Sequence, residues 1–96
     1  MRKSFSLHLN MPHFVYILYS KRIDKYYVGK TENVDKRTEY HNSEFNKIWT
    51  NRGKPWELVQ TLEFENSTLT SKAEHFIKKQ KSRKLIEKIV REGWSI

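Results

Sequence analysis

One apolar run near the start of the chain limits the possible folds more than any other feature. Phe14–Tyr19 is rich in β-branched and aromatic residues, lies between Pro12 and Ser20, and carries apolar side chains on both of its alternating faces. This pattern is typical of a strand that is buried on both sides. A chain of 96 residues can cover such a strand within one modest core, so we expect a single small domain.

The polarity pattern of the remaining chain predicts a small α/β domain. Its elements, in order, are strand 14–19, strand 26–30, a helix capped by Thr31 or Asn33, a loop over 42–54, strand 56–65, a helix after 66–70 and a helix capped by Ser82. Strand 56–65 is predicted to be an outer strand whose one apolar face carries Trp56, Leu58, Leu62 and Phe64. The order β-β-α-β-α-α defines a mainly antiparallel three-stranded sheet flanked by helices.

Composition restricts the class of partner. The chain has 19 Lys and Arg against 11 Asp and Glu, and the resulting net charge of +8 favours a polyanion. It has no apolar run near the roughly 18 residues of a membrane span, and the apolar stripes of its basic helices are needed for the core, so we expect nucleic acid and no membrane. The lack of cysteine excludes a disulfide scaffold, a thiolate metal site and a cysteine nucleophile.

Residues 1–12 are predicted to be a disordered N-terminal extension, and residues 13–94 the folded domain. The first ten residues include Arg2 and Lys3 but no continuous apolar segment, so we do not expect a signal peptide. Together with the lack of cysteine, this favours a cytoplasmic protein.

A set of polar residues attached to the predicted apolar elements carries the strongest functional signal. The paired strands contain Val15-Tyr16-Ile17 and Tyr27-Val28-Gly29, Arg37 follows on the next helix, and Glu74 borders a later apolar stripe. In these elements and their order, residues 13–92 resemble the GIY-YIG nuclease superfamily, most closely its small stand-alone members. The resemblance implies a metal-dependent endonuclease that hydrolyses DNA phosphodiester bonds, in DNA repair or recombination.

The resemblance also implies roles for individual side chains. Tyr27 is the expected general base, Tyr16 positions phosphate or water, Arg37 binds phosphate, His41 and Lys30 assist them, and Glu74 holds one Mg²⁺ or Mn²⁺ ion. The residue types suit this chemistry, because arginine presents a planar charged fork to phosphate, and Mg²⁺ commonly binds one or two carboxylates plus phosphate and water. A free tyrosine titrates near about 10, so a tyrosine base needs a positive charge nearby.

Basic residues late in the chain and in the long loop are predicted to form a rim that follows the DNA backbone. They are Lys47, Arg52, Lys54, Lys78, Lys79, Lys81, Arg83 and Lys84. A solvated helix face is the alternative for such residues. A monomer is the working hypothesis, and the choice of DNA structure, or of DNA over RNA, stays open.

Two other classes of function stay open at this point. The chain departs from the family at Val15, in place of glycine, at Ala73, in place of a basic residue, and near Ile86, in place of an asparagine. These differences fit a catalytically weak or inactive nucleic-acid-binding module on the same scaffold. The positive charge alone also fits an interaction domain for an acidic protein.

The same residues have ordinary structural roles as alternatives. Tyr16 and Tyr27 can serve as core aromatics, and Glu74 can pair with Lys78 one helical turn later. Arg37 and His41 can form a solvated face of the first helix. The order and spacing of all these residues along the chain, taken together, favour a nuclease-like site over these ordinary roles.

Overall fold

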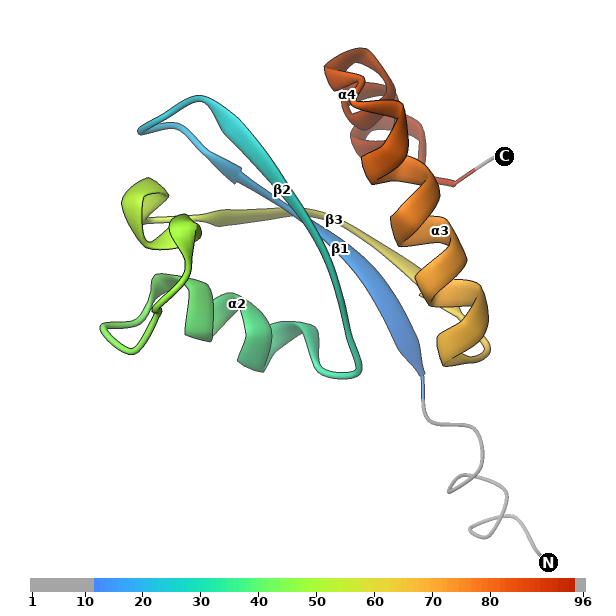
Figure 1. Ribbon diagram of the computed structural model, residues 1–96, viewed down its shortest axis with the longest axis horizontal. Helices are drawn as coiled ribbons and strands as arrows, with labels where there is room; N and C mark the ends of the chain where they lie inside the picture. Colours follow the sequence, from blue (N-terminus) through green and yellow to red (C-terminus); the bar gives the residue numbers. More distant parts are fainter. Residues whose placement is uncertain (1–11, 95–96) are drawn as a thin grey trace, which may run out of the picture.

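The computed structural model describes residues 12–94, which form the predicted order β-β-α-β-α-α (Figure 1). The elements are β1 (His13–Ser20), β2 (Lys25–Thr31), α2 (Val34–Asn42), the 3₁₀ helix η1 (Trp49–Gly53), β3 (Glu57–Phe64), α3 (Ser67–Gln80) and α4 (Arg83–Glu92). The segment predicted as a loop between α2 and β3 therefore contains one short helix. The predicted α/β fold with three antiparallel strands is confirmed.

β1 is the central strand of the sheet. The strand order is β2-β1-β3, and both neighbours run antiparallel to β1. Four consecutive residues of β1, Val15 to Leu18, are at most 1% exposed. The strand predicted to be buried on both sides is thus buried, and β3 lies at an edge as predicted.

Side-chain caps fix the starts of the helices. The side chains of Asn33, Asn66 and Ser82 accept hydrogen bonds from backbone N–H groups in the first turns of α2, α3 and α4. Such caps are typically worth about 1 kcal/mol each. Ser82 caps α4 as predicted, and of the two candidates for α2 the structure uses Asn33.

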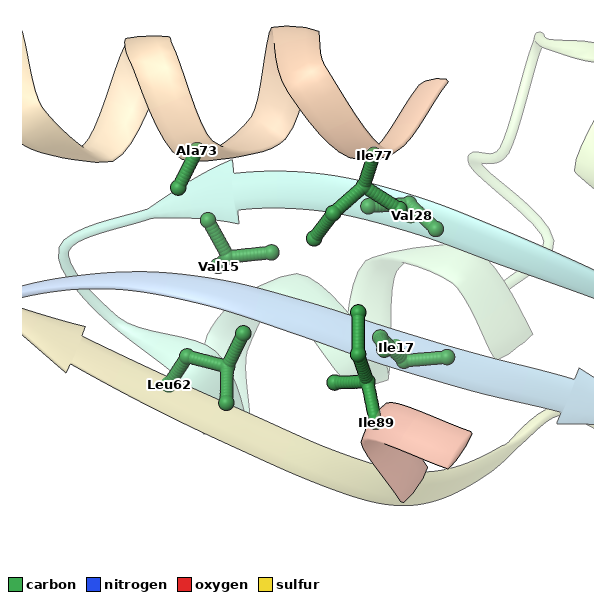
Figure 2. Close-up of a cluster of buried hydrophobic side chains, with 7 residues drawn as sticks. All are labelled: Val15, Ile17, Val28, Leu62, Ala73, Ile77 and Ile89. Carbon is green, nitrogen blue, oxygen red and sulfur yellow. The ribbon is translucent and has the colours of Figure 1, made fainter. Parts of the chain in front are cut away.

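The helices cover the sheet from both sides and form two separate cores (Figure 1). On the α3 face, aliphatic side chains of the sheet pack against those of α3 and α4, as Figure 2 shows. They are Val15, Ile17, Val28, Leu62, Ala73, Ile77 and Ile89. On the α2 face, α2 and η1 cover Tyr16, Leu18 and Trp56. The α3 face is therefore apolar, whereas the α2 face combines packing with polar groups.

One prediction about β3 is wrong, because its apolar residues do not share one face. Two adjacent residues of β1 pair with Gln60 and Leu58, so Val59 is an extra residue in β3 and forms a β-bulge. A shift of one residue reverses the faces of a strand. Leu62 consequently packs in the α3 core, and Trp56 packs in the α2 core.

The predicted N-terminal extension lies, except for Pro12, outside the described residues. Among residues 12–94, no helix has both the length and the apolar composition that are needed to cross a membrane.

Candidate active site

The α2 face of the sheet holds a close group of aromatic and polar side chains. The Tyr16 hydroxyl lies 2.9 Å from Nε2 of His41, and both residues are at most 1% exposed. The centroid of the Tyr27 ring is 4.6 Å from that of His41 and 6.1 Å from that of Tyr16. Two strands and one helix thus bring three of the predicted catalytic residues together.

Gly29 gives Tyr16 the room that it needs. The two residues are cross-strand partners, and the Tyr16 ring lies across the glycine. A Cβ atom on Gly29 would be 2.5 Å from the Tyr16 hydroxyl oxygen, which is too close for a non-bonded contact. The glycine of the second family triplet therefore positions Tyr16, a role that its sequence pattern does not reveal.

A buried polar network extends from His41 into the segment between α2 and β3. Nδ1 of His41 is 2.9 Å from Oγ1 of Thr50, which also accepts a hydrogen bond of 2.8 Å from Nδ2 of Asn46. The same Nδ2 donates to the His41 carbonyl at 2.8 Å, and Nε1 of Trp56 donates to the Thr50 carbonyl at 2.6 Å. Sequence reasoning missed Asn46 and Thr50, because polar residues in a turn-rich segment are normally solvated.

Arg37 lies one helical turn before His41 on α2, so both side chains leave the same side of the helix. Its guanidinium carbon is 4.9 Å from the centroid of the Tyr40 ring. The half-buried Arg37 therefore places a permanent positive charge beside the Tyr16–His41 pair.

Burial determines the ionisation of Tyr16 and His41. Removal from water raises the pKa of Tyr16 well above its ordinary value of 10.0, neighbouring Tyr27 raises it further, and Arg37 opposes the rise. Burial, and then the charge of Arg37, lower the pKa of His41 from 6.5 to about 4. At neutral pH both side chains are therefore uncharged.

The neutral, buried His41 is expected to make folding sensitive to acid. An unfolded chain protonates this histidine below about pH 6.5, whereas the folded chain does so only near pH 4. Between these values the unfolded state binds more protons, so the free energy of unfolding should fall by about 3 kcal/mol as the pH drops from 6.5 to 4. Urea unfolding at a series of pH values measures this loss.

Two histidine variants separate this contribution from general acid sensitivity. His41→Gln should lose this part of the pH dependence, while His75→Gln, at an exposed histidine, should retain it. An unchanged pH dependence in His41→Gln would contradict a neutral, buried His41.

Glu74 and Lys30 approach the site from the other side of β2. Glu74 belongs to α3, and its Oε2 is 3.1 Å from Nζ of Lys78. That ammonium lies 5.8 Å from the centroid of the Tyr27 ring. Lys30 donates from Nζ to Oγ of Ser71 on α3 at 2.8 Å. The Glu74–Lys78 pair therefore links α3 to Tyr27 at the exposed edge of β2.

The structure thus divides the predicted catalytic residues into two sets. The α2 face holds Tyr16, Tyr27, Arg37 and His41. Glu74 and Lys30 lie on the α3 side, and Glu74 reaches the first set through Lys78. Among residues 12–94, no three His, Cys, Asp or Glu side chains are grouped to hold a metal ion. Glu74, a hard oxygen donor that is 16% exposed, fits a site in which one carboxylate is completed by phosphate and water.

A groove of about 550 Å³ follows the edge of β2. Its lining includes Tyr27, Trp49, Lys25, Lys78, Lys81 and Arg83. Lys78, Lys81 and Arg83 belong to the predicted DNA-binding rim, so this groove carries positive charge directly beside Tyr27.

The other residues of the predicted rim do not line this groove. Lys79 and Lys84 are exposed on α3 and α4, and Lys47, Arg52 and Lys54 lie in the segment between α2 and β3. Lys54 donates to the Ser43 carbonyl at 3.1 Å, which ties it to its own segment. Arg83 forms ion pairs with Asp24 at 2.8 Å and Glu87 at 3.0 Å, so part of its charge is neutralised within the chain.

The sheet with its two covered faces, the strand tyrosines and the helical arginine define a small α/β domain with a candidate active site on the α2 face. The model of the GIY-YIG catalytic domain family matches residues 12–87, so the chain belongs to the GIY-YIG family of nuclease domains and the resemblance is confirmed. The chain is also similar to the solution NMR structure of UPF0213 protein BH0048 from Bacillus halodurans. The two share 33% sequence identity with a TM-score of 0.54, over 86% of this chain and 87% of that chain. No curated protein matches the chain.

Proposed function

We propose that the protein is a metal-dependent endonuclease that hydrolyses DNA phosphodiester bonds, in DNA repair or recombination. The observation that carries the proposal is the close group of two tyrosines, a histidine and an arginine on the α2 face, with the Glu74–Lys78 pair at its edge. Membership of the GIY-YIG family and the net charge of +8 support it.

In this proposal each residue of the α2 face has a separate task. Arg37 binds phosphate oxygens through its planar fork and stabilises the negative charge that builds up in the transition state. Tyr16 keeps its proton at neutral pH and donates a hydrogen bond to phosphate or to the attacking water, since burial raises its pKa. Tyr27 is the general base, and its ring lies 5.8 Å from the Lys78 ammonium, at the edge of the group that faces the groove.

Glu74 is the proposed ligand of one Mg²⁺ or Mn²⁺ ion. A divalent ion bound there would act as a Lewis acid toward a phosphate oxygen. The low exposure of the Glu74 side chain and its contact with Lys78 keep the carboxylate oriented at the edge of β2. A single carboxylate leaves most of the coordination shell to phosphate and water, as is common for Mg²⁺.

A cleavage assay tests the proposed function. The purified protein is incubated with Mg²⁺ or Mn²⁺ and with plain, nicked, flapped or branched DNA, and with RNA of the same sequence. We expect internal cleavage of at least one DNA substrate and its loss in EDTA. Binding without cleavage would favour the second candidate, a nucleic-acid-binding module. The lysines that line the groove, Lys78 and Lys81, are the observation that favours this candidate. Neither binding nor cleavage would contradict both.

DNA affinity is expected to fall steeply with added salt, because basic residues that contact phosphates release counterions. Replacing Lys78, Lys79 and Lys81 with glutamine should reduce the slope of log K against log salt by about three. Fluorescence anisotropy at several salt concentrations measures the slope. A matched triple replacement at Lys21, Arg22 and Lys36, which are exposed but outside the predicted rim, should leave most of the slope. Equal slopes for the two triple variants would contradict the predicted rim.

A further inference from the structure

Asn46 has a fixed orientation in the buried network behind His41. The backbone N–H of Ile48 donates to Oδ1 of Asn46 at 2.9 Å, so Oδ1 is the acceptor and Nδ2 is the donor of this amide. Nδ2 donates to Oγ1 of Thr50 at 2.8 Å. The Thr50 hydroxyl therefore accepts one hydrogen bond and must find an acceptor for its own proton.

Only one partner of Thr50 can take that proton. Thr50 is fully buried, and within residues 12–94 its Oγ1 contacts Nδ2 of Asn46 and Nδ1 of His41, the latter at 2.9 Å. If Nδ1 carried a proton, Thr50 would accept two hydrogen bonds and bury its own proton without a partner, which is rare in folded proteins. Nδ1 is therefore the acceptor, and the ring proton of His41 is on Nε2.

We infer that Asn46 and Thr50 are positioning residues, which hold His41 in its Nε2–H tautomer so that His41 donates a hydrogen bond to Tyr16. The donors then follow one direction, from Asn46 through Thr50 and His41 to the Tyr16 oxygen 2.9 Å away. This arrangement requires a neutral imidazole, and the low pKa of His41, which follows from burial and the charge of Arg37, provides it at pH 7.

The direction of these hydrogen bonds decides what Tyr16 can do. When Nε2–H donates, the phenol oxygen accepts, so His41 does not hold the Tyr16 proton and Tyr16 can donate it to another acceptor. In the other tautomer, Tyr16 would donate to His41, and its proton would be held away from the substrate. The use of this proton in catalysis rests on the proposed function, whereas the tautomer does not.

Nitrogen-15 NMR of the histidine rings tests the assignment in the free protein at pH 7. We expect His41 to show a protonated Nε2 and an unprotonated Nδ1. Thr50→Val keeps the shape of the side chain but removes the donor, so His41 should lose this preference and kcat should fall about tenfold with little change in KM. Thr50→Ser, which retains a hydroxyl, should keep the tautomer and the rate.

Thr70→Val is the matched control. Thr70 is 2% exposed on α3, and its hydroxyl donates to the Asn66 carbonyl at 2.8 Å, so this variant removes a similarly buried hydroxyl from the helix that covers the opposite face of the sheet. It should change neither the His41 spectrum nor the rate.

A protonated Nδ1 in the wild-type protein would overturn the inference, even if Thr50→Val does not fold. A folded Thr50→Val protein with the wild-type tautomer and rate would overturn it as well. A wild-type Nε2–H tautomer that is lost in Thr50→Val, in a protein that cleaves no DNA, would support the positioning of His41 and contradict the proposed function alone.

Discussion

Arg37→Ala is expected to lower the rate of DNA cleavage by about 10²–10³-fold and to weaken DNA binding far less. The reason is that a bidentate contact to phosphate gains most of its value as charge builds up on the phosphoryl group in the transition state. Arg37 is suited to this role because it lies beside the two uncharged groups Tyr16 and His41, and within residues 12–94 its guanidinium forms no ion pair with a carboxylate. Single-turnover cleavage rates and equilibrium binding, measured on the same DNA, separate the two effects.

Two further variants show whether the fork or the charge matters. Arg37→Lys should recover little of the rate, since an ammonium cannot reproduce two parallel hydrogen bonds. Lys36→Ala removes an exposed positive charge from the neighbouring position of α2 and should leave the rate nearly unchanged. If Arg37→Ala lost affinity as strongly as rate, Arg37 would be a binding contact only, and the proposed role in the transition state would be wrong.

The fold could be predicted from local patterns because its elements have strong ones. The apolar run of β1 permits burial on two faces, and Ser82 is a cap followed directly by a helical stripe. The faces of β3 could not be predicted, because alternation assumes that each residue opposes one partner. Val59 breaks that assumption, and no glycine or proline marks the bulge in the sequence.

The residues of the α2 face could be predicted to the extent that regular geometry brings them together. Arg37 and His41 are four residues apart on one helix, and strand pairing brings the segments of Tyr16 and Tyr27 together. The hydrogen bonds that hold these side chains in place could not be predicted. Thr50 contacts His41 only because the segment between α2 and β3 folds back over the sheet, and that path depends on tertiary contacts such as the bond from Trp56 to the Thr50 carbonyl.

Lys78 illustrates how one contact can have two interpretations. The sequence offered a pair of Glu74 and Lys78 as the structural alternative to a metal ligand, and the structure contains that pair at 3.1 Å. An i, i+4 ion pair on a helix contributes only about 0.3–0.5 kcal/mol to stability, so the pair alone does little to stabilise the fold. The same ammonium also lies 5.8 Å from the Tyr27 ring, which connects the pair to the α2 face and is compatible with a functional role.

Glu74→Gln is expected to reduce Mg²⁺-dependent cleavage to the level of a no-enzyme control, while the protein stays folded. Glutamine keeps the shape of the side chain but removes the negative charge that a hard divalent ion requires from its single protein carboxylate. The unfolding temperature should change little, because the lost ion pair with a half-exposed lysine contributes little. Calorimetric titration with Mn²⁺ should show one site in the wild-type protein and none in the variant.

Glu87→Gln is the matched control for this experiment, because it breaks another i, i+4 ion pair, that of Glu87 with Arg83 on α4. Both variants remove one negative charge and one surface pair, so they should have similar stability, and only Glu74→Gln should lose the metal and the activity. If Glu87→Gln lost as much activity, the effect would come from surface charge rather than from a ligand. If Glu74→Gln kept full activity with Mg²⁺, Glu74 would be only the ion-pair partner of Lys78, and the divalent ion would have to bind elsewhere in the complex with DNA.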